Sequence, residues 1–230
     1  MLMRLFFTQL FASERKQIAF MTDEKSPARI SHRLFVTSRS EKRIIMLEHL
    51  MIAEQNILLW LQNNMRNDIL NHIMIFITSL GNAGAIWIIM AVGLLIPKKT
   101  RKTGIMVISG LLLSFIINNI ILKNLVARTR PYDMIAGLTS LVGIQSDYSF
   151  PSGHAASSFV AAVIIFKSLP KKYGIPALIL AFLILFSRLY VGVHYPTDVI
   201  AGALIATIIG LFVCWLEKII EGKIIGTKTL

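Results

Sequence analysis

Five long apolar segments constrain this chain more than any other feature. They cover residues 70–96, 104–122, 155–169, 175–193 and 199–216. A helix needs about 20 residues to cross the hydrocarbon core of a bilayer, and a segment in lipid must satisfy its own backbone hydrogen bonds, which favours helices. The chain has 55% hydrophobic and only 16% charged residues, which is far too apolar for a soluble domain. We therefore predict an all-α membrane protein, in which the third segment needs the residues just before it to reach across.

Basic residues gather in the connections between these segments. Lysines and arginines cluster at 98–102, at 167–172 and from 218 to the end of the chain. Because consecutive spans run in opposite directions, all three clusters fall on one side of the membrane, and the positive-inside rule makes that side cytoplasmic. The net charge of +12 therefore reflects membrane topology. Nucleic acid is not expected as a partner, because the basic residues form no single amphipathic face.

The first part of the chain has a different composition. Residues 1–43 contain nine Lys or Arg against four Asp or Glu, which predicts a basic tail, flexible or interfacial, without a packed core. Residues 44–61 are apolar but interrupted by charged and amide side chains, a pattern that favours a helix lying at the membrane surface. If this segment crosses instead, the bundle has six transmembrane helices rather than five. The predicted membrane-embedded domain covers 44–217, and 218–230 form a short basic cytoplasmic tail.

Three polar motifs lie at the other ends of the apolar segments. They are Lys-x6-Arg-Pro at 123–131, Pro-Ser-Gly-His at 151–154 and Ser-Arg-x5-His-x3-Asp at 187–198. Alternation of the spans places all three on the extracytoplasmic side, and ionisable groups crowded at span ends indicate a functional site. The long loop that joins the first two motifs carries Asp133 and Asp147. Such a loop is expected to cover the site or to select substrate.

Three cations are expected to meet at this site. Lys123 and Arg130 are seven residues apart, so they face the same way if the helix continues, and Arg188 reaches the same face from another span. Close cations repel one another unless an anion lies among them, and an arginine donates to phosphate in a fork. Ser152 and Gly153 stand where the third segment begins, so that a helix N-terminus can face a phosphate oxygen. Simple snorkelling of the first two cations at a span end would not explain the third.

Two histidines and an aspartate complete the predicted site. His194 is followed four residues later by Asp198, a spacing that lets the carboxylate bond one imidazole nitrogen and leave the other nucleophilic. A purely structural pair or a metal site built from these groups is the alternative. The nearby cations make a divalent ion electrostatically unfavourable, so we expect no metal and no other cofactor. His154 closes the second motif and stands on the same side of the membrane.

Taken together, the three motifs resemble the signature of the type 2 phosphatidic acid phosphatase (PAP2) family. The resemblance implies that His194 is the nucleophile and forms a phosphohistidine, that Asp198 orients it, and that His154 protonates the leaving oxygen. It also implies a set of phosphate-binding residues, namely Lys123, Arg130, Ser152, Gly153 and Arg188. The family's reaction requires no metal. The fold it implies is a helical bundle with the active site at the extracytoplasmic face.

The same resemblance implies a phosphatase that hydrolyses a lipid phosphate or diphosphate at the outer face of the cell membrane. Undecaprenyl diphosphate is the favoured substrate, because compact bacterial members of the family often recycle that carrier. Phosphatidylglycerophosphate, phosphatidate and lipid A phosphate are the alternatives. From a different class, a non-catalytic lipid-phosphate binding or transport protein would need only the cations, whereas this sequence keeps both histidines and the aspartate. Its partners are then the substrate and membrane lipids, and the oligomeric state stays open.

Overall fold

The computed structural model describes residues 39–227, with side-chain burial described for 44–222. The predicted basic tail therefore lies outside the described residues, apart from 39–43. The chain divides into two units, residues 1–57 and 58–230. Most of α3 belongs to the first unit, and the packing contacts and the site described below belong to the second. All regular elements in the described part are helical, which agrees with the predicted all-α fold.

The helices differ widely in length. In chain order they are α3 (Arg39–Met65), α4 (Asp68–Leu80), η1 (Asn82–Gly84), α5 (Ala85–Leu95), α6 (Arg101–Ser114), the π-helix η2 (Phe115–Leu122), α7 (Lys123–Val126), α8 (Pro131–Met134), α9 (Gly153–Ser168), α10 (Lys171–Tyr190) and α11 (Pro196–Thr227). The loop that joins α8 to α9 contains no regular element. The helix α11 continues well beyond residue 217, where the sequence places the start of a basic tail.

Several of these helices are long and apolar enough to cross a membrane. Within the described residues four meet that test, and a fifth span results if the bent pair α4 and α5 is counted as one. The segment Ile44–Met65 of α3 is among the four, although the sequence pattern favours a surface position for its first part. The side chains on the outer faces of α4, α5, α6, α10 and α11 include many exposed Ile, Leu and Phe residues. A surface this apolar fits contact with lipid, and the protein is a multi-pass membrane protein.

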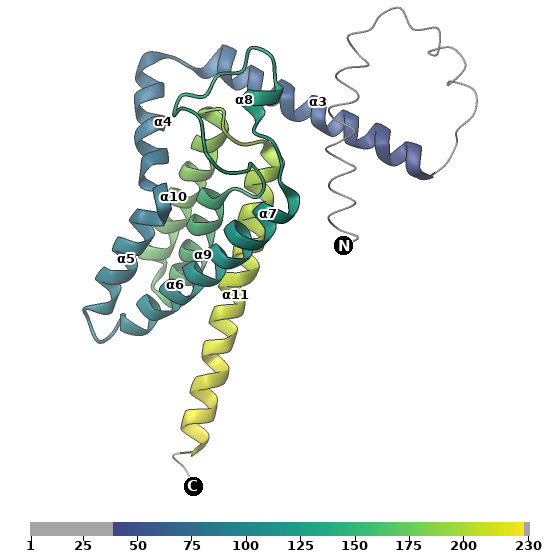
Figure 1. Ribbon diagram of the computed structural model, residues 1–230. Helices are drawn as coiled ribbons and strands as arrows, with labels where there is room; N and C mark the ends of the chain where they lie inside the picture. The colour runs from purple at the N-terminus through teal and green to yellow at the C-terminus, as the bar shows by residue number, and fades with distance from the viewer. Residues whose placement is uncertain (1–38, 228–230) are drawn as a thin grey trace, which may run out of the picture. The chain divides into compact units, whose positions relative to one another are not determined.

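The short helix α9 lies inside the bundle. It packs against α6, α10 and α11 (Figure 1), and ten of its sixteen residues are buried. Its sequence is rich in alanine and serine, whose small side chains let neighbouring helices approach closely. The buried Trp87 of α5 also donates a hydrogen bond to Ser158 of α9 (2.9 Å). This central position explains why the third apolar segment is shorter than a free-standing span.

The first predicted span is broken rather than continuous. The helices α4 and α5 are bent by 47° at a break of a few residues, where Ala83 and Gly84 have φ angles of 51° and 71°. Such left-handed backbone ends a helix. Gly81, at this break, lies close to α9. A Cβ added to Gly81 would lie 2.7 Å from the ring of His154. The bend therefore places the α4–α5 corner beside one of the predicted catalytic histidines.

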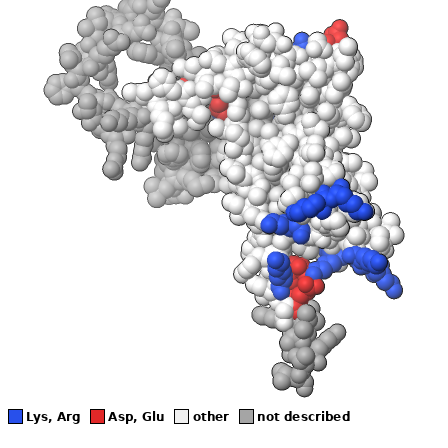
Figure 2. All heavy atoms as spheres, turned by 180° about the vertical axis from the view of Figure 1, so that it is seen from behind, with Lys and Arg blue, Asp and Glu red and all other residues white. Residues whose placement is uncertain are grey.

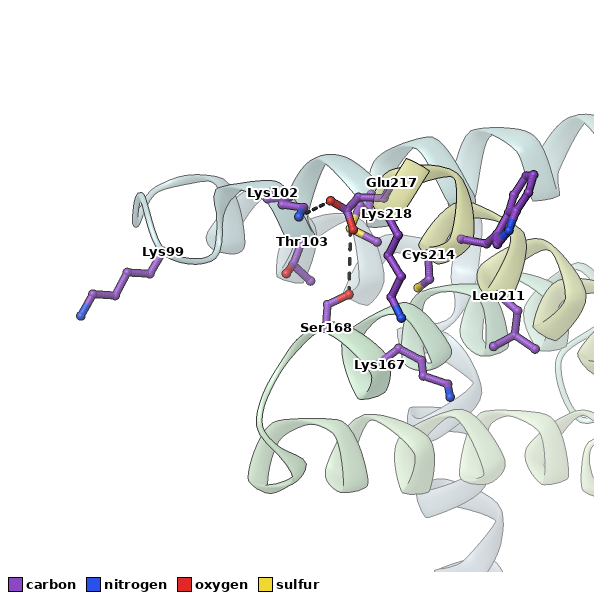
Figure 3. Close-up of a pocket in the computed structure, with 11 residues that line it drawn as sticks. Lys99, Lys102, Thr103, Lys167, Ser168, Leu211, Cys214, Glu217 and Lys218 are labelled. Carbon is purple, nitrogen blue, oxygen red and sulfur yellow. Dashed lines mark hydrogen bonds and ion pairs between the residues drawn. The ribbon is translucent and has the colours of Figure 1, made fainter. Parts of the chain in front are cut away.

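Lysines from all three predicted basic clusters lie at the end of the bundle opposite the α4–α5 break. A pocket there is lined by Lys99 and Lys102 near the start of α6, by Lys167 at the end of α9 and by Lys218 of α11 (Figure 3). Lys102 forms ion pairs with Glu217 and Glu221. Figure 2 shows the blue basic side chains gathered towards this end, beside a broad surface with few charges. Members of the three clusters therefore lie at one end of the bundle, as the alternation of the spans predicts.

The close packing of α10 on α9 can be tested at one glycine. A Cβ on Gly174 would lie 2.6 Å from the Cα of Phe166, so Gly174→Ala should overpack this contact. We expect the free energy of unfolding to fall by about 1–3 kcal/mol, measured as a lower Tm in detergent. The matched control is Gly93→Ala, because a Cβ there meets no atom within 4 Å. That control should stabilise its helix by roughly 0.5–1 kcal/mol, and an equal loss in both variants would contradict the packing argument.

Candidate active site

The three sequence motifs converge at one end of the bundle. The first runs from the start of α7 to the start of α8, the second opens α9, and the third links the end of α10 to the start of α11. A backbone hydrogen bond joins two of them directly, since the N–H of Ser152 donates to the carbonyl of Asp198 (3.0 Å). The cations and the imidazole of the site are buried, with exposed fractions of 5% for Lys123, 4% for Arg130, 2% for Arg188 and 1% for His194.

The carboxylate of Asp198 is fully buried and faces the Nδ1 side of His194. Its Oδ2 lies 3.5 Å from Nδ1 and accepts hydrogen bonds from the hydroxyl of Ser149 (2.5 Å) and the backbone N–H of Tyr195 (2.9 Å). The Ser149 hydroxyl oxygen is itself 3.5 Å from Nδ1. The aspartate and the serine together therefore line one edge of the imidazole ring, and the loop before α9 supplies the serine.

Arg128 occupies the other oxygen of this carboxylate. Its Nη1 donates to Oδ1 of Asp198 (2.7 Å) and to the hydroxyl of Thr197 (2.7 Å). The guanidinium also lies over the ring of Tyr195, with 3.7 Å between its central carbon and the ring centroid. A buried carboxylate needs such a partner, because an isolated charge is strongly disfavoured in a low-dielectric interior. Arg128 therefore fixes the aspartate that faces His194.

Arg130 approaches the opposite edge of the same imidazole. Its Nη1 is 3.1 Å from Nε2 of His194 and donates to the carbonyl of Val193 (2.7 Å). A guanidinium can only donate hydrogen bonds, so Nε2 is the accepting nitrogen and the ring proton sits on Nδ1, towards Asp198. This tautomer leaves a lone pair on Nε2. Arg130 holds its position because Pro131 begins α8 and the preceding backbone is extended.

Lys123 and Arg130 share a single carboxylate from the loop before α9. The ammonium of Lys123 pairs with Oδ2 of Asp147, and Nη2 of Arg130 donates to Oδ1 (2.5 Å). The Nε of Arg130 also donates to the backbone carbonyl of Asp147 (3.1 Å). Lys123 follows the π-helix η2, a local irregularity of a kind that often occurs at functional sites.

The remaining predicted residues are held by partners on the first bent span and on α9. Arg188 donates to the hydroxyl of the buried Thr78 on α4 (2.7 Å). The Nε2 of His154 lies 3.0 Å from Oδ1 of Asn82 at the α4–α5 break. Ser152 caps α9, with its hydroxyl accepting from the N–H of Ala155 (3.4 Å). Each side chain is thus oriented by a neighbour that lies outside the three motifs.

Gly153 begins α9 beside the polar side chain of Asn119. A Cβ on Gly153 would lie 3.0 Å from the amide nitrogen of Asn119, so a larger residue would press on this contact. The glycine keeps the first turn of α9 open to the site. Among the described residues, no three His, Cys, Asp or Glu side chains gather in a way that could hold a metal ion.

Comparison with known proteins decides the family. The family model of the PAP2 superfamily matches residues 103–220. This chain belongs to the PAP2 superfamily. It is similar to the undecaprenyl-diphosphatase of Sulfolobus acidocaldarius, at 36% identity over 65% of this chain and 71% of that protein. It is also similar to the undecaprenyl-diphosphatase BcrC of Bacillus subtilis, at 32% identity over 63% of this chain and 73% of that protein.

A solved structure of the same superfamily supports the fold. The crystal structure of a transmembrane PAP2 type phosphatidylglycerolphosphate phosphatase from Bacillus subtilis aligns with a TM-score of 0.61 at 27% identity. The alignment covers 74% of this chain and 87% of that one. The family resemblance drawn from the three motifs is therefore confirmed, and this PAP2 protein is a lipid phosphatase by family.

The structure adds residues to the PAP2 site that the motifs did not predict. They are Arg128, Ser149, Thr78, Asn82 and the carboxylate of Asp147. The sequence held a signal for two of them, because Arg128 lies between two motif cations and Asp147 lies in the loop expected to cover the site. Thr78 and Asn82 carried no such signal, since they meet Arg188 of α10 and His154 of α9 only in the folded chain.

The electrostatics of the site keep His194 neutral. Its complete burial, together with the positive charges of Arg130, Arg188 and Lys123, holds the pKa of the imidazole well below its ordinary value. The neutral form is the one that has a nucleophilic lone pair. Burial alone would raise the pKa of Asp147, but the hydrogen bonds and charges of Lys123 and Arg130 outweigh it and lower that pKa. Asp147 is therefore ionised at neutral pH.

A titration can check the state of this imidazole. Because the pKa of His194 is lowered, the substrate-free protein should keep the ring neutral as the pH falls from about 8 through the ordinary histidine pKa of ~6.5. We expect its ring nitrogen signals in 15N-histidine NMR to stay constant over that range, with His194→Asn assigning the signal. A midpoint near 6.5 would contradict the burial and charge argument.

The positioning role of Arg128 predicts a separation of kinetic constants. In Arg128→Lys the charge remains but one hydrogen bond to Asp198 or Thr197 is lost, at a cost of about 1.5–3 kcal/mol. If that cost falls on the transition state, kcat drops roughly 10- to 100-fold while KM for a lipid phosphate stays nearly constant.

The matched control for this prediction is Arg101→Lys. Arg101 is the first residue of α6, at the end of that helix away from the site, and it donates to the carbonyl of Leu95. Its kcat and KM should equal those of the unmodified protein. A rise in KM alone for Arg128→Lys would show that Arg128 binds substrate rather than orienting Asp198.

Proposed function

We propose that this protein is a metal-independent phosphatase that hydrolyses a lipid phosphate or diphosphate through a phosphohistidine intermediate. The observation that carries the proposal is the environment of His194. One edge of the ring faces the paired carboxylate of Asp198, and the other presents Nε2 to a group of buried cations. A neutral imidazole held in one tautomer beside an anion-binding pocket is suited to attack phosphorus.

In the proposed first step, Nε2 of His194 attacks phosphorus and the bond from phosphorus to the leaving oxygen breaks. His154 donates its proton to that oxygen. The phosphorylated ring of His194 then carries a positive charge, which Asp198 stabilises. In the second step His154 takes a proton from water, the water oxygen attacks phosphorus, and the N–P bond breaks to release inorganic phosphate. The charge on the non-bridging oxygens is stabilised by three cations, Lys123, Arg130 and Arg188. Backbone N–H groups near Ser152 and Gly153 donate hydrogen bonds to the same oxygens.

Undecaprenyl diphosphate is our favoured substrate. The two relatives named undecaprenyl-diphosphatase support this choice, and a diphosphate brings more negative charge to the buried cations than a monoester does. The solved relative is a phosphatidylglycerolphosphate phosphatase, so phosphatidylglycerophosphate is the first alternative. A non-catalytic lipid-phosphate binding protein is the alternative from another class, and it would have no use for a histidine fixed in a nucleophilic tautomer.

We further propose that the site faces the extracytoplasmic side of the cell membrane. The lysine-lined pocket between α6, α9 and α11 lies at the opposite end of these helices from the site. Basic residues favour the cytoplasmic side, which leaves the site on the outer side. There it lies at the level of the lipid head groups, where a phosphate attached to a long apolar tail can enter without leaving the bilayer.

The proposed mechanism predicts different defects for the two histidines. With lipid diphosphate in EDTA, His194→Ala should lose activity by at least about 10³-fold, as expected when a nucleophile is removed. His154→Ala should lose about 10²–10⁴-fold, but much of that loss should disappear with an aryl phosphate, because a good leaving group needs no proton. The purified protein with labelled substrate should also trap an acid-labile phosphohistidine, absent in His194→Ala.

His72→Ala serves as the control, because His72 lies on α4 with its ring bonded to the carbonyl of Asp68. It should keep full activity. Hydrolysis that persists in His194→Ala, or that vanishes in EDTA, would overturn the mechanism. Phosphate binding by the purified protein with no turnover of any lipid would favour the binding protein.

A further inference from the structure

Asp147 stands where a substrate phosphate is expected. Its two carboxylate oxygens bond two different cations, Lys123 through Oδ2 and Arg130 through Oδ1. These are the two phosphate-binding residues of the first motif. A carboxylate that bridges an ammonium and a guanidinium makes the contacts that two oxygens of a phosphate would make.

The site needs such an anion when it is empty. Lys123, Arg130 and Arg188 are each at least 95% buried, and like charges gathered in a low-dielectric region repel one another strongly. Asp198 cannot compensate them in the same way, because its Oδ1 is bonded to Arg128 and its Oδ2 to Ser149 and Tyr195. Within residues 44–222, Asp147 is therefore the carboxylate that bonds Lys123 and Arg130 directly.

Asp147 also differs from those cations in exposure and in the element that carries it. Its side chain is 49% exposed, whereas the side chains of Lys123 and Arg130 are 7% and 5% exposed. It belongs to the irregular loop between α8 and α9, whereas Lys123 belongs to a helix of the bundle. The carboxylate can therefore rotate outward into solvent while the cations stay in place.

The loop is held on both sides of Asp147. Before it, the N–H of Gln145 donates to the hydroxyl of Tyr132 (2.9 Å). After it, the N–H of Ser149 donates to the carbonyl of Arg128 (2.8 Å), and its hydroxyl bonds Asp198. Because the chain is anchored two residues away on each side, a displaced carboxylate stays close enough to return.

We propose that Asp147 is an exchangeable counter-ion that the substrate phosphate displaces and that returns as inorganic phosphate leaves. This inference rests on the proposed function of Lys123 and Arg130 as phosphate ligands. It makes Asp147 a specificity-determining residue. A lipid phosphate, which its tail holds in the bilayer at high local concentration beside the site, can displace the carboxylate, whereas free inorganic phosphate competes poorly and product inhibition stays weak.

An alternative role for Asp147 predicts the opposite sign. If the carboxylate only orients Lys123 and Arg130 for substrate, its removal should weaken phosphate binding. If it competes with phosphate, its removal should strengthen binding. A charge a few ångströms away acts strongly on an ionised group, since an opposite charge lowers a carboxyl pKa by about 1–3. Removing a competing carboxylate should act on a similar scale, so we expect inorganic phosphate to bind the Asp147→Asn variant roughly tenfold more tightly or better.

The test uses the full chain in detergent and inorganic phosphate as the probe. Equilibrium binding by calorimetry and the inhibition constant against lipid hydrolysis are measured for the unmodified protein and for Asp147→Asn. Asp147→Glu keeps the charge and should bind phosphate weakly, like the unmodified protein. Asp133→Asn removes the same charge from an exposed position on α8 and should leave phosphate binding unchanged.

Tighter phosphate binding and a lower inhibition constant in Asp147→Asn alone would support the proposal. Equal or weaker binding in that variant, or equal tightening in Asp133→Asn, would overturn it. Should Asp147→Asn fail to fold, as judged by its Tm, Asp147→Ser carries the same prediction. A protein that hydrolyses no lipid phosphate would refute the proposed function, whereas the calorimetric comparison would still decide the role of Asp147.

Discussion

Compensation of buried positive charge is the constraint on which this site depends. Four cations, Lys123, Arg128, Arg130 and Arg188, are each no more than 5% exposed at one end of an apolar bundle. Two carboxylates balance them in different ways. Asp198 is fully buried and bonded on both oxygens, one of them to Arg128. Asp147 is half-exposed and bonds Lys123 and Arg130, the cations that we propose bind phosphate. In our proposal, one carboxylate supports the nucleophile His194, and the other makes way for the phosphate.

The bundle holds these groups in register through α9. Because this helix is central, its N-terminus meets both the start of α11 and the α4–α5 break. The hydrogen bond from Ser152 to the carbonyl of Asp198 ties the helix start expected to bind phosphate to the turn that carries His194. The bend between α4 and α5 adds Asn82 beside His154. A site assembled from the ends of several helices is therefore cross-linked by hydrogen bonds between residues that are far apart in sequence.

Much of this arrangement could be predicted from the motifs. The residue types and spacings in 123–131, 151–154 and 187–198 indicated the family, and alternation of the apolar segments indicated that the motifs meet at one end. The details of the spans were less predictable. Residues 70–96 form two helices bent by 47° rather than one continuous helix. Hydropathy could not predict this bend, because it is insensitive to the positive φ angles at Ala83 and Gly84. The third apolar segment is short because α9 is surrounded by protein rather than by lipid.

The helical membrane fold, the family and the residues expected to bind and attack phosphate could be inferred from the residues alone, because they follow from hydropathy and from chemistry confined to short motifs. Which partner orients each of those residues depends on the packing of the helices. Arg128 pairs with Asp198 across 70 positions of sequence and Arg188 with Thr78 across 110. The same is true of Asp147, an ordinary loop aspartate in the sequence that bridges two buried cations in the folded protein. Long-range pairings of this kind depend on how helices pack, and no local pattern of residues encodes them.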